Sequence, residues 1–143
     1  MTTANPSSPG LITVGTPEEK KHAELSLQQF MEECSGATGA MVATSDGFVI
    51  AASFKTDVAM RSLAAITSSI MSLAESLAKE TKHGACHNLV IEAEAGNAIS
   101  LRVNRTRILT VMAEHHTRLG LLLNTAKRCT ERLANVRENT ETL

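Results

Sequence analysis

The sequence contains very few aromatic residues: of its 143 residues three are Phe, and Tyr and Trp are absent. Proteins that bind single-stranded nucleic acid usually stack the bases on aromatic side chains. An excess of positive charge is absent too, because 14 basic and 15 acidic side chains leave a net charge of −1. Such a chain has no electrostatic footprint for nucleic acid or for an anionic membrane surface. We therefore expect neither of them as a partner.

Long apolar runs and a disulfide framework are also absent. No apolar stretch approaches the ~20 residues that cross a bilayer, and the N-terminus lacks the basic and then apolar order of a secretory signal. The three cysteines, Cys34, Cys86 and Cys129, form an odd and widely spaced set. That pattern is typical of free thiols in a reducing compartment. The sequence predicts a cytoplasmic protein that does not insert into a membrane.

Motifs that carry chemistry are missing as well. The P-loop pattern Gly-x-x-x-x-Gly-Lys-Ser/Thr is absent, so we expect no nucleotide site of that kind. His83, Cys86 and His87 lie close together, but no further Cys or His stands nearby to complete the four ligands of a zinc site. The adjacent side chains of His115 and His116 diverge, which favours a solvated turn. We predict no catalytic residue, no metal, no cofactor and no enzyme activity.

The clearest local signal is Ser45-Asp46-Gly47, which lies between two apolar runs. Asp-Gly between such runs favours a tight hairpin, because Gly adopts a positive φ at little cost. The strands are predicted at about residues 39–44 and 48–53. Both runs are apolar at successive positions, so each strand needs cover on both faces.

Three segments show helical periodicity. The first, at about 17–35, begins with Thr16 as a cap, Pro17 at the first helical position and Glu19 where a capping box places its acid. The second covers about 57–81, and the third begins near Thr117 and ends near residue 137. The middle helix carries two stripes. One is large and apolar, comprising Leu63, Ile66, Ile70, Leu73 and Leu77; the other is small, comprising Ala64, Ala65, Ser68, Ser69 and Ser72.

The small stripe has two interpretations, which the residues alone leave open. Small side chains let another backbone approach closely, so this helix can pack on two sides. Alternatively, Ala and Ser are simply acceptable residues on a helix surface.

Three further strands are predicted at about 87–94, 98–104 and 108–113, the last of them central because it is apolar on both faces. The order predicts an α+β fold: one α/β/α sandwich with a five-stranded antiparallel sheet and helices on both faces, which bury every apolar stripe. The domain is expected at 16–137, between a flexible leader at 1–15 and a frayed tail at 138–143. The apolar leader residues 11–14 either stay disordered or pair at a sheet edge.

This layout, with Gly-Ala-x-x-x-x-Ser-Asp-Gly-x-x-Ile-Ala at residues 39–51, resembles the roadblock family. Its relatives include the dynein light chain of that name and bacterial partners of small Ras-like GTPases. Further short motifs stand where that family has them: Leu-Ala-Ala at 63–65, Val-Ile-Glu at 90–92 followed by Gly96, Leu-Thr-Val at 109–111, and Leu119-Gly120. The resemblance covers about residues 17–137 and implies the profilin-like roadblock fold.

The resemblance also implies a homodimer, in which the sheets meet through the third strand and the long helices pack side by side. Carried onto this chain, the interface residues are Ala64, Ala65, Ser68, Ser69, Ser72, Leu89, Val90 and Ile91, and the residues facing a GTPase are Met60, Arg61 and Leu63.

The function that the resemblance implies is non-enzymatic regulation of a small Ras-like GTPase in bacterial signalling or polarity, as activator or effector platform. A passive scaffold and a small-molecule sensor are the alternatives. Exposed arginines could also supply an arginine finger to such a GTPase, but the family assigns no such residue and we assign none. The candidates are Arg61, Arg102, Arg105 and Arg107.

Overall fold

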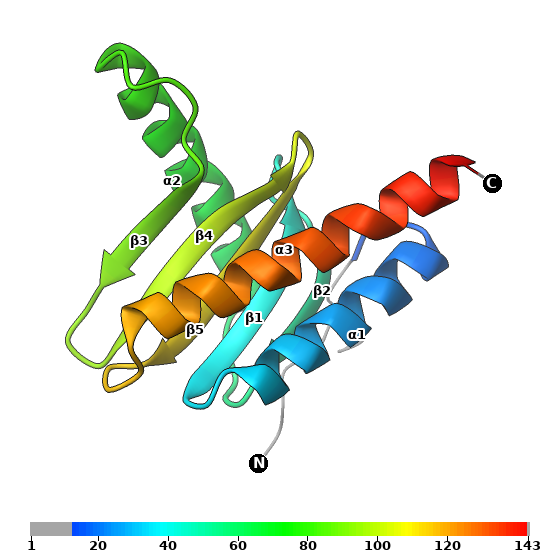
Figure 1. Cartoon of the computed structure of the whole chain (residues 1–143), viewed down its shortest axis with the longest axis horizontal. Coiled ribbons are helices and arrows are strands. Elements are labelled where there is room, and N and C mark those ends of the chain that lie inside the picture. Colours follow the sequence, from blue (N-terminus) through cyan, green and yellow to red (C-terminus); the bar gives the residue numbers. More distant parts are fainter. Residues whose placement is uncertain (1–12, 143) are drawn as a thin grey trace.

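The computed structural model describes the backbone of residues 13–142 and the side chains of residues 13–135 (Figure 1). The predicted order of helices and strands is confirmed. The elements are α1 (Pro17–Glu33), β1 (Ala37–Thr44), β2 (Val49–Phe54), α2 (Met60–Glu80), β3 (Asn88–Glu92), β4 (Gly96–Asn104), β5 (Arg107–Glu114) and α3 (Leu119–Thr142). The backbone of α3 is helical to Thr142, beyond the end at about residue 137 that the apolar stripe predicted.

The five strands form one antiparallel sheet in the order β2-β1-β5-β4-β3. Strand β5 lies in the middle, as its two-sided apolar sequence predicted, and β2 and β3 are the edges. Helices α1 and α3 lie side by side on one face, and α2 lies on the other (Figure 1). This arrangement confirms the predicted α+β sandwich.

The β1–β2 turn has the predicted geometry. The backbone N–H of Thr44 donates to the carbonyl of Phe48 at 2.8 Å, and the Thr44 hydroxyl accepts from the N–H of Phe48 at 2.9 Å. Gly47 has a φ of +92°, which a residue with a Cβ adopts only at a cost. The Asp-Gly pair therefore marks the turn for the reason that the sequence suggested.

The start of α1 is also as predicted. The Thr16 hydroxyl accepts from the N–H of Glu19 at 3.1 Å, and Pro17 opens the helix. The carboxylate of Glu19 reaches the guanidinium of Arg107 at the start of β5, 2.8 Å away. One acid therefore lies at the helix N-terminus, where negative charge is favoured, and ties α1 to the sheet.

The larger core lies between the sheet and the pair α1 and α3. Its biggest buried side chains include Leu27 and Phe30 from α1, Ile99 and Leu109 from the sheet, and Leu122 from α3. Ile99 and Leu101 point into this core from β4, with Val103 packed against it, as their strict alternation predicted.

The end of the N-terminal leader pairs at a sheet edge. Thr13 forms a parallel bridge with Val49, and the N–H of Val14 donates to the carbonyl of Val49 at 3.0 Å. Val14 also packs against the larger core. Of the apolar leader residues, Leu11 and Ile12 lie outside the described part of the chain.

The smaller core lies under α2 and corrects one prediction. Met60, Ala64, Thr67 and Met71 are the buried residues of α2, spaced by four, three and four. The first two pack in the smaller core with side chains of β1 and β2. The small side chain of Ala64 lets the helix backbone approach strands that already carry long side chains such as Phe54.

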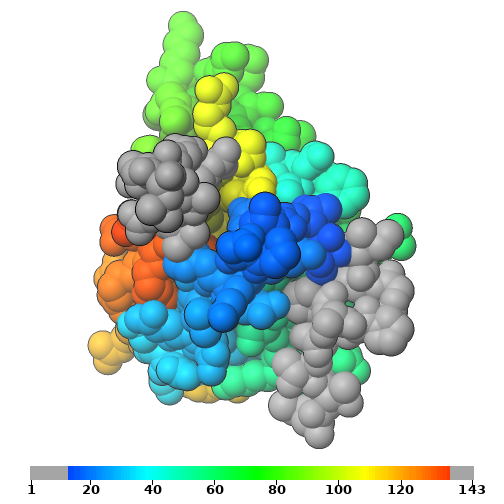
Figure 2. Space-filling model, turned by 90° about the vertical axis from the view of Figure 1, so that its right-hand side faces the viewer, coloured from blue at the N-terminus to red at the C-terminus, as the bar shows by residue number. Residues whose placement is uncertain are grey.

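The sequence predicted that the large apolar stripe of α2 is buried within the chain along its whole length, and this prediction is wrong: Leu63 and Ile70 are half-buried, but the other members are exposed. Ile66, Leu73 and Leu77 are 52%, 70% and 66% exposed. Figure 1 and Figure 2 show why: α2 crosses the sheet obliquely, and its C-terminal end, with the loop that follows, stands clear of the rest of the molecule.

Candidate functional site

The exposed apolar side chains gather on two elements. Eight large apolar residues are exposed among those whose side chains are described, and five of them lie on α2 and β3. Beside the three of α2, these are Val90 and Ile91. Soluble monomers rarely expose several such residues together, so this concentration marks an interaction surface. We call these five residues the apolar face; its members on α2 and Ile91 lie on one side of the sheet, and Val90 points to the other side at the β3 edge.

Two side chains of β3 point to the side of the sheet on which α2 lies. Val90 is paired with Ile99, whose side chain is in the core under α1 and α3. Because side chains alternate along a strand, Leu89 and Ile91 point to the opposite side, where α2 packs. A hollow of about 290 Å³ next to Ile91 is lined by Ala98 and Met112. This part of the sheet is apolar and is left uncovered by the chain's own helix.

Strand β3 also presents a free backbone edge. The N–H of Arg102 donates to the carbonyl of His87 at 3.4 Å, and the N–H of Ala93 donates to the carbonyl of Gly96 at 2.9 Å. Odd-numbered residues of β3 thus direct their backbone groups to β4, and the even-numbered residues between them face outward. An edge of this kind can pair with another strand.

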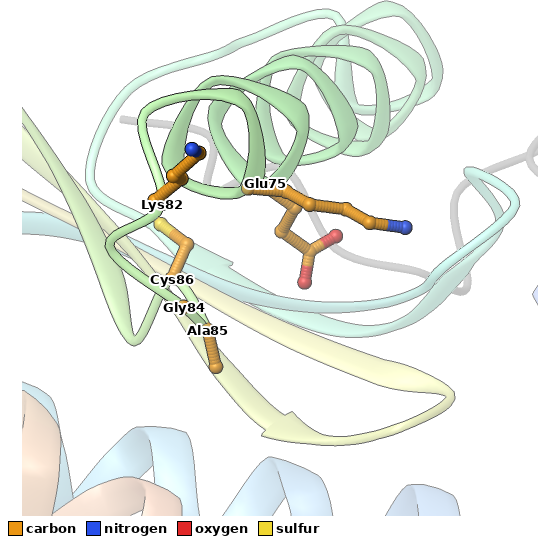
Figure 3. A pocket seen from close by; sticks show the side chains of 6 residues that line it. Glu75, Lys82, Gly84, Ala85 and Cys86 are labelled. Carbon is orange, nitrogen blue, oxygen red and sulfur yellow. The ribbon is translucent and has the colours of Figure 1, made fainter.

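A second hollow, of about 540 Å³, lies under the C-terminal part of α2 (Figure 3). Figure 3 shows the carboxylate of Glu75 pointing from α2 toward the sheet, and the sulfur of Cys86 pointing from the loop before β3 toward Lys82. Lys79, Gly84 and Ala85 complete the lining. The C-terminal part of α2 is thus not packed tightly on the strands beneath it.

One ion pair crosses this gap. Arg102 of β4 binds the Glu75 carboxylate through two parallel contacts, Nε to Oε2 at 3.1 Å and Nη2 to Oε1 at 2.7 Å. Its Nη1 donates to the Ser45 hydroxyl at 2.6 Å and to the Arg105 carbonyl at 3.4 Å. The Ser68 hydroxyl in turn donates to the Ser45 carbonyl. Side chains and turns far apart in the sequence thus meet under α2.

The three thiols are free and differ in accessibility. Cys34 and Cys129 are buried in the larger core, and burial raises both pKa values, that of Cys129 to about 11 in spite of the nearby Arg132. Cys86 is only half-buried.

This difference predicts one fast thiol per chain. At pH 8 a thiol of pKa about 11 is only ~0.1% thiolate, the reactive form. With a chromogenic thiol reagent we expect Cys86 to react at least about 100-fold faster than Cys34 and Cys129, which should react only as the chain unfolds. Stopped-flow absorbance measures the phases. A fast phase that survives in Cys86→Ser would contradict this assignment.

The predicted interface residues of α2 differ in whether their side chains are buried or exposed. Ala64 is buried against the chain's own sheet, and Ser68 is half-buried and bonded to Ser45, so neither side chain is free for a second copy. Ala65, Ser69 and Ser72 are exposed. The sequence pattern identified the large stripe, which includes Leu73 and Leu77. We predicted that it packs in the chain's own core, so these two leucines were not predicted as surface residues.

The other predicted residues are distributed as follows. On β3, Leu89 is half-buried, and Val90 and Ile91 are exposed. Of the three residues predicted to face a GTPase, Arg61 is exposed, Leu63 is half-buried beside the smaller core, and Met60 is buried within that core. Met60 is therefore unavailable to a partner, because it anchors the first turn of α2.

The arginines considered as arginine fingers, and two of the histidines considered as metal ligands or turn residues, have the following surroundings. Arg102 and Arg107 are engaged with Glu75 and Glu19, whereas the side chains of Arg61 and Arg105 are exposed. The histidine at 83 approaches the Thr81 hydroxyl at 2.7 Å, and the one at 116 pairs with Glu114 at 3.0 Å in the turn before α3.

Metal clusters and membrane-spanning helices are both absent from the described residues. No three His, Cys, Asp or Glu side chains gather there in a way that could hold a metal ion. Within the same part of the chain, no helix combines the length and the apolar character needed to cross a membrane.

Solved structures resemble this fold closely. MglB of Myxococcus xanthus matches with a TM-score of 0.80 at 20% identity, over 88% of this chain and 95% of that one. The gliding protein MglB of Thermus thermophilus matches with a TM-score of 0.78 at 21% identity, over 92% and 98%. Profilin II of Acanthamoeba castellanii matches with a TM-score of 0.54 at 14% identity, over 78% and 96%. The predicted profilin-like roadblock fold is confirmed.

A search among curated proteins finds no match to the sequence. The Roadblock/LC7 domain, in contrast, matches residues 24–113, from within α1 to the end of β5. That span is more than half of the chain and includes the apolar residues of both α2 and β3. The chain therefore belongs to the Roadblock/LC7 domain family.

Proposed function

We propose that the chain acts as a homodimer that binds and regulates a small Ras-like GTPase and is not itself an enzyme. The observation that carries the proposal is the apolar face: Ile66, Leu73 and Leu77 on α2 and Val90 and Ile91 on β3 are exposed in the single chain. Fully burying one such side chain is worth about 1.5–3 kcal/mol. Exposure of all five is costly unless a second protein covers them.

A second copy of the chain fits this face. In an antiparallel pair of β3 strands centred on Val90, Asn88 of one copy lies opposite Glu92 of the other, and Leu89 opposite Ile91. The even-numbered residues, whose backbone groups point outward, then bond to one another. Directly opposite residues share a face of the sheet, so this register places both α2 helices on the same side. Their exposed stripes can then meet.

The register also separates like charges. Glu92 is the only charged residue of β3, and in this pairing it faces an amide and not a second carboxylate. Like charges directly opposite each other destabilise a strand pair. Apolar contact, backbone pairing and charge thus favour the same arrangement of two copies.

The GTPase partner is proposed from the family. The roadblock relatives that this chain resembles include bacterial partners of small Ras-like GTPases, and a neighbour in fold is described as a gliding protein. Within this chain, Arg61 is the exposed member of the three residues that the resemblance places toward a GTPase. It lies in the first turn of α2, away from the exposed Leu73 and Leu77, so dimer formation leaves it accessible.

Arg61 supplies the test of this surface. Arg61→Glu should weaken binding to a GTP-analogue-loaded small Ras-like GTPase about tenfold, because reversing a charge at an interface costs about 1 kcal/mol or more. Biolayer interferometry against a panel of such GTPases measures the affinity, and light scattering confirms that the variant keeps the mass of the wild type. Arg118→Glu, an exposed charge next to α3, is the control and should bind like the wild type. Equal affinity for wild type and Arg61→Glu would remove this surface from the proposal.

A hydrolysis assay then separates regulator from scaffold. A regulator changes the rate at which the GTPase hydrolyses GTP, whereas a passive scaffold binds without changing it. The two outcomes refer to the same complex, so the assay is informative once binding has been measured.

A further inference from the structure

Helix α2 is held to its own sheet in two different ways along its length. Its first half packs through the side chains of Met60, Ala64, Thr67 and Met71, which are buried. In its second half each residue from 72 to 80 is half-buried or exposed. The most exposed apolar side chains, Leu73 and Leu77, lie in that second half. Apolar packing therefore fixes the start of α2 but not the direction of its end.

The second half is supported by the Glu75–Arg102 ion pair. The two parallel contacts fix both the distance and the angle between guanidinium and carboxylate, as in other bidentate pairs. Arg102 is held from its other side by the Ser45 hydroxyl in the β1–β2 turn and the Arg105 carbonyl in the β4–β5 turn. The guanidinium thus has little freedom, and it links α2 to a rigid part of the sheet.

The space around this pair is open. The hollow of about 540 Å³ lies on one side of Glu75, and another of about 470 Å³, lined by Arg102, Asn104 and Arg105, also includes Glu75. With hollows beside it, the second half of α2 can tilt if the ion pair is released. No tightly packed side chains oppose such a tilt within the described part of the chain, in contrast to the first half.

We propose that Glu75 and Arg102 are positioning residues for self-association: they hold the second half of α2 at the tilt at which Leu73 and Leu77 meet the same residues of a second copy. The inference rests on the proposed homodimer and adds to it a pair that bonds within the chain, with the Glu75 carboxylate pointing toward the chain's own sheet. The side chains of Arg102 and Glu75 are 23% and 38% exposed, so water screens their charges, and we expect the pair to contribute less to folding than the buried side chains of the first half of α2. A large effect on dimer formation with a small effect on stability is the signature of positioning.

The test is Glu75→Gln, which keeps the size of the side chain but removes its charge. We expect the dimer dissociation constant to rise about tenfold, within the range of coupling found for residues in one network, with a melting temperature close to that of the wild type. Analytical ultracentrifugation over a dilution series measures the constant, with refractive-index detection because Trp and Tyr are absent. The control is Glu80→Gln, an exposed glutamate of the same helix, which should leave the constant unchanged.

Two further variants separate positioning from general weakening. The charge swap Glu75→Arg/Arg102→Glu should recover at least part of the affinity lost in Arg102→Glu alone, because it restores an ion pair across the same gap. Val111→Ala truncates a fully buried side chain in the larger core, on the opposite face of the sheet from the pair, and should lower stability without changing the dissociation constant.

The outcomes distinguish this inference from the proposed function. A wild-type chain that is monomeric overturns both. A wild-type dimer whose dissociation constant is unchanged in Glu75→Gln overturns the positioning role and leaves the homodimer standing. The positioning role is also overturned if the charge swap recovers no affinity and Val111→Ala weakens the dimer as much as Glu75→Gln does. Dimer affinity would then follow the stability of the fold and not the ion pair.

Discussion

A Leu73→Glu/Leu77→Glu variant will be monomeric at concentrations at which the wild-type chain is dimeric. Each leucine is about two-thirds exposed in the single chain, so in the dimer each gains burial worth about 1.5–3 kcal/mol at most. Losing both, and placing two like charges on each copy at the contact, should raise the dissociation constant at least about 100-fold. Light scattering on a dilution series measures the change. The folded single chain should tolerate the substitutions, because neither side chain is in its core.

The matched control is Ser72→Glu, which adds the same charge to the neighbouring position of the same helix. Ser72 belongs to the exposed part of the small stripe, and its own side chain points about 100° away from that of Leu73 around the helix. We expect this variant to remain a dimer. If Ser72→Glu separates the two copies while the double leucine variant stays dimeric, the two helices meet through the small stripe, as the family resemblance implied.

The second large effect is expected at the β1–β2 turn. Gly47→Val should destabilise the fold by about 2 kcal/mol, because a β-branched residue is strained at a φ of +92°. A Cβ at this position would also lie 3.4 Å from the Cα of Ala65 in α2, so the added methyl groups press on the helix. The melting temperature should fall by about 4–8 °C, as measured by circular dichroism.

Gly84→Val is the control for this prediction. Gly84 also has a positive φ, +82°, but a Cβ there would meet no heavy atom within 4 Å. Its loop can adjust its backbone, so we expect a smaller loss of stability than for Gly47→Val. A melting temperature of Gly47→Val equal to that of the wild type would show that the turn accepts a side chain, and the hairpin geometry would then be wrong.

Local chemistry made much of the fold predictable. The Asp-Gly turn, the Thr16 cap and the alternation of Ile99, Leu101 and Val103 each depend on residues that are neighbours in the sequence. The central place of β5 followed from its apolar character on both faces. In each case the sequence pattern and the physical constraint act over the same few residues, so one can be inferred from the other.

The orientation of α2 was not predictable in the same way. A stripe of large apolar residues shows only that something covers it, and a second copy can provide that cover as well as the chain's own sheet. Which stripe faced inward depended on the strands: β1 and β2 already carry long side chains such as Met41 and Phe54, so the helix face with the small Ala64 fitted there. Helical periodicity contains no information about how large the side chains are on the strands that the helix packs against.

The bonds of Arg102 to Glu75 and Ser45 could not be predicted either, because they join residues that are far apart in the sequence. Glu75 and Arg102 are 27 residues apart, and Ser45 and Arg102 are 57 apart. Nothing in the residues around any of the three predicts that they meet. The sequence indicated Arg102 as an exposed arginine near a turn, whereas the structure shows its guanidinium engaged on two sides.

The measurement that tests the central claim most directly is the mass of the wild-type chain in solution, alone and mixed with small Ras-like GTPases loaded with GDP or with a GTP analogue. The account predicts twice the chain mass of 15.3 kDa for the protein alone, and a larger complex that forms with the GTP-like state of a GTPase. A single-chain mass, unchanged by either nucleotide state of every GTPase tested, would contradict both the dimer through the apolar face and the regulatory role built on it.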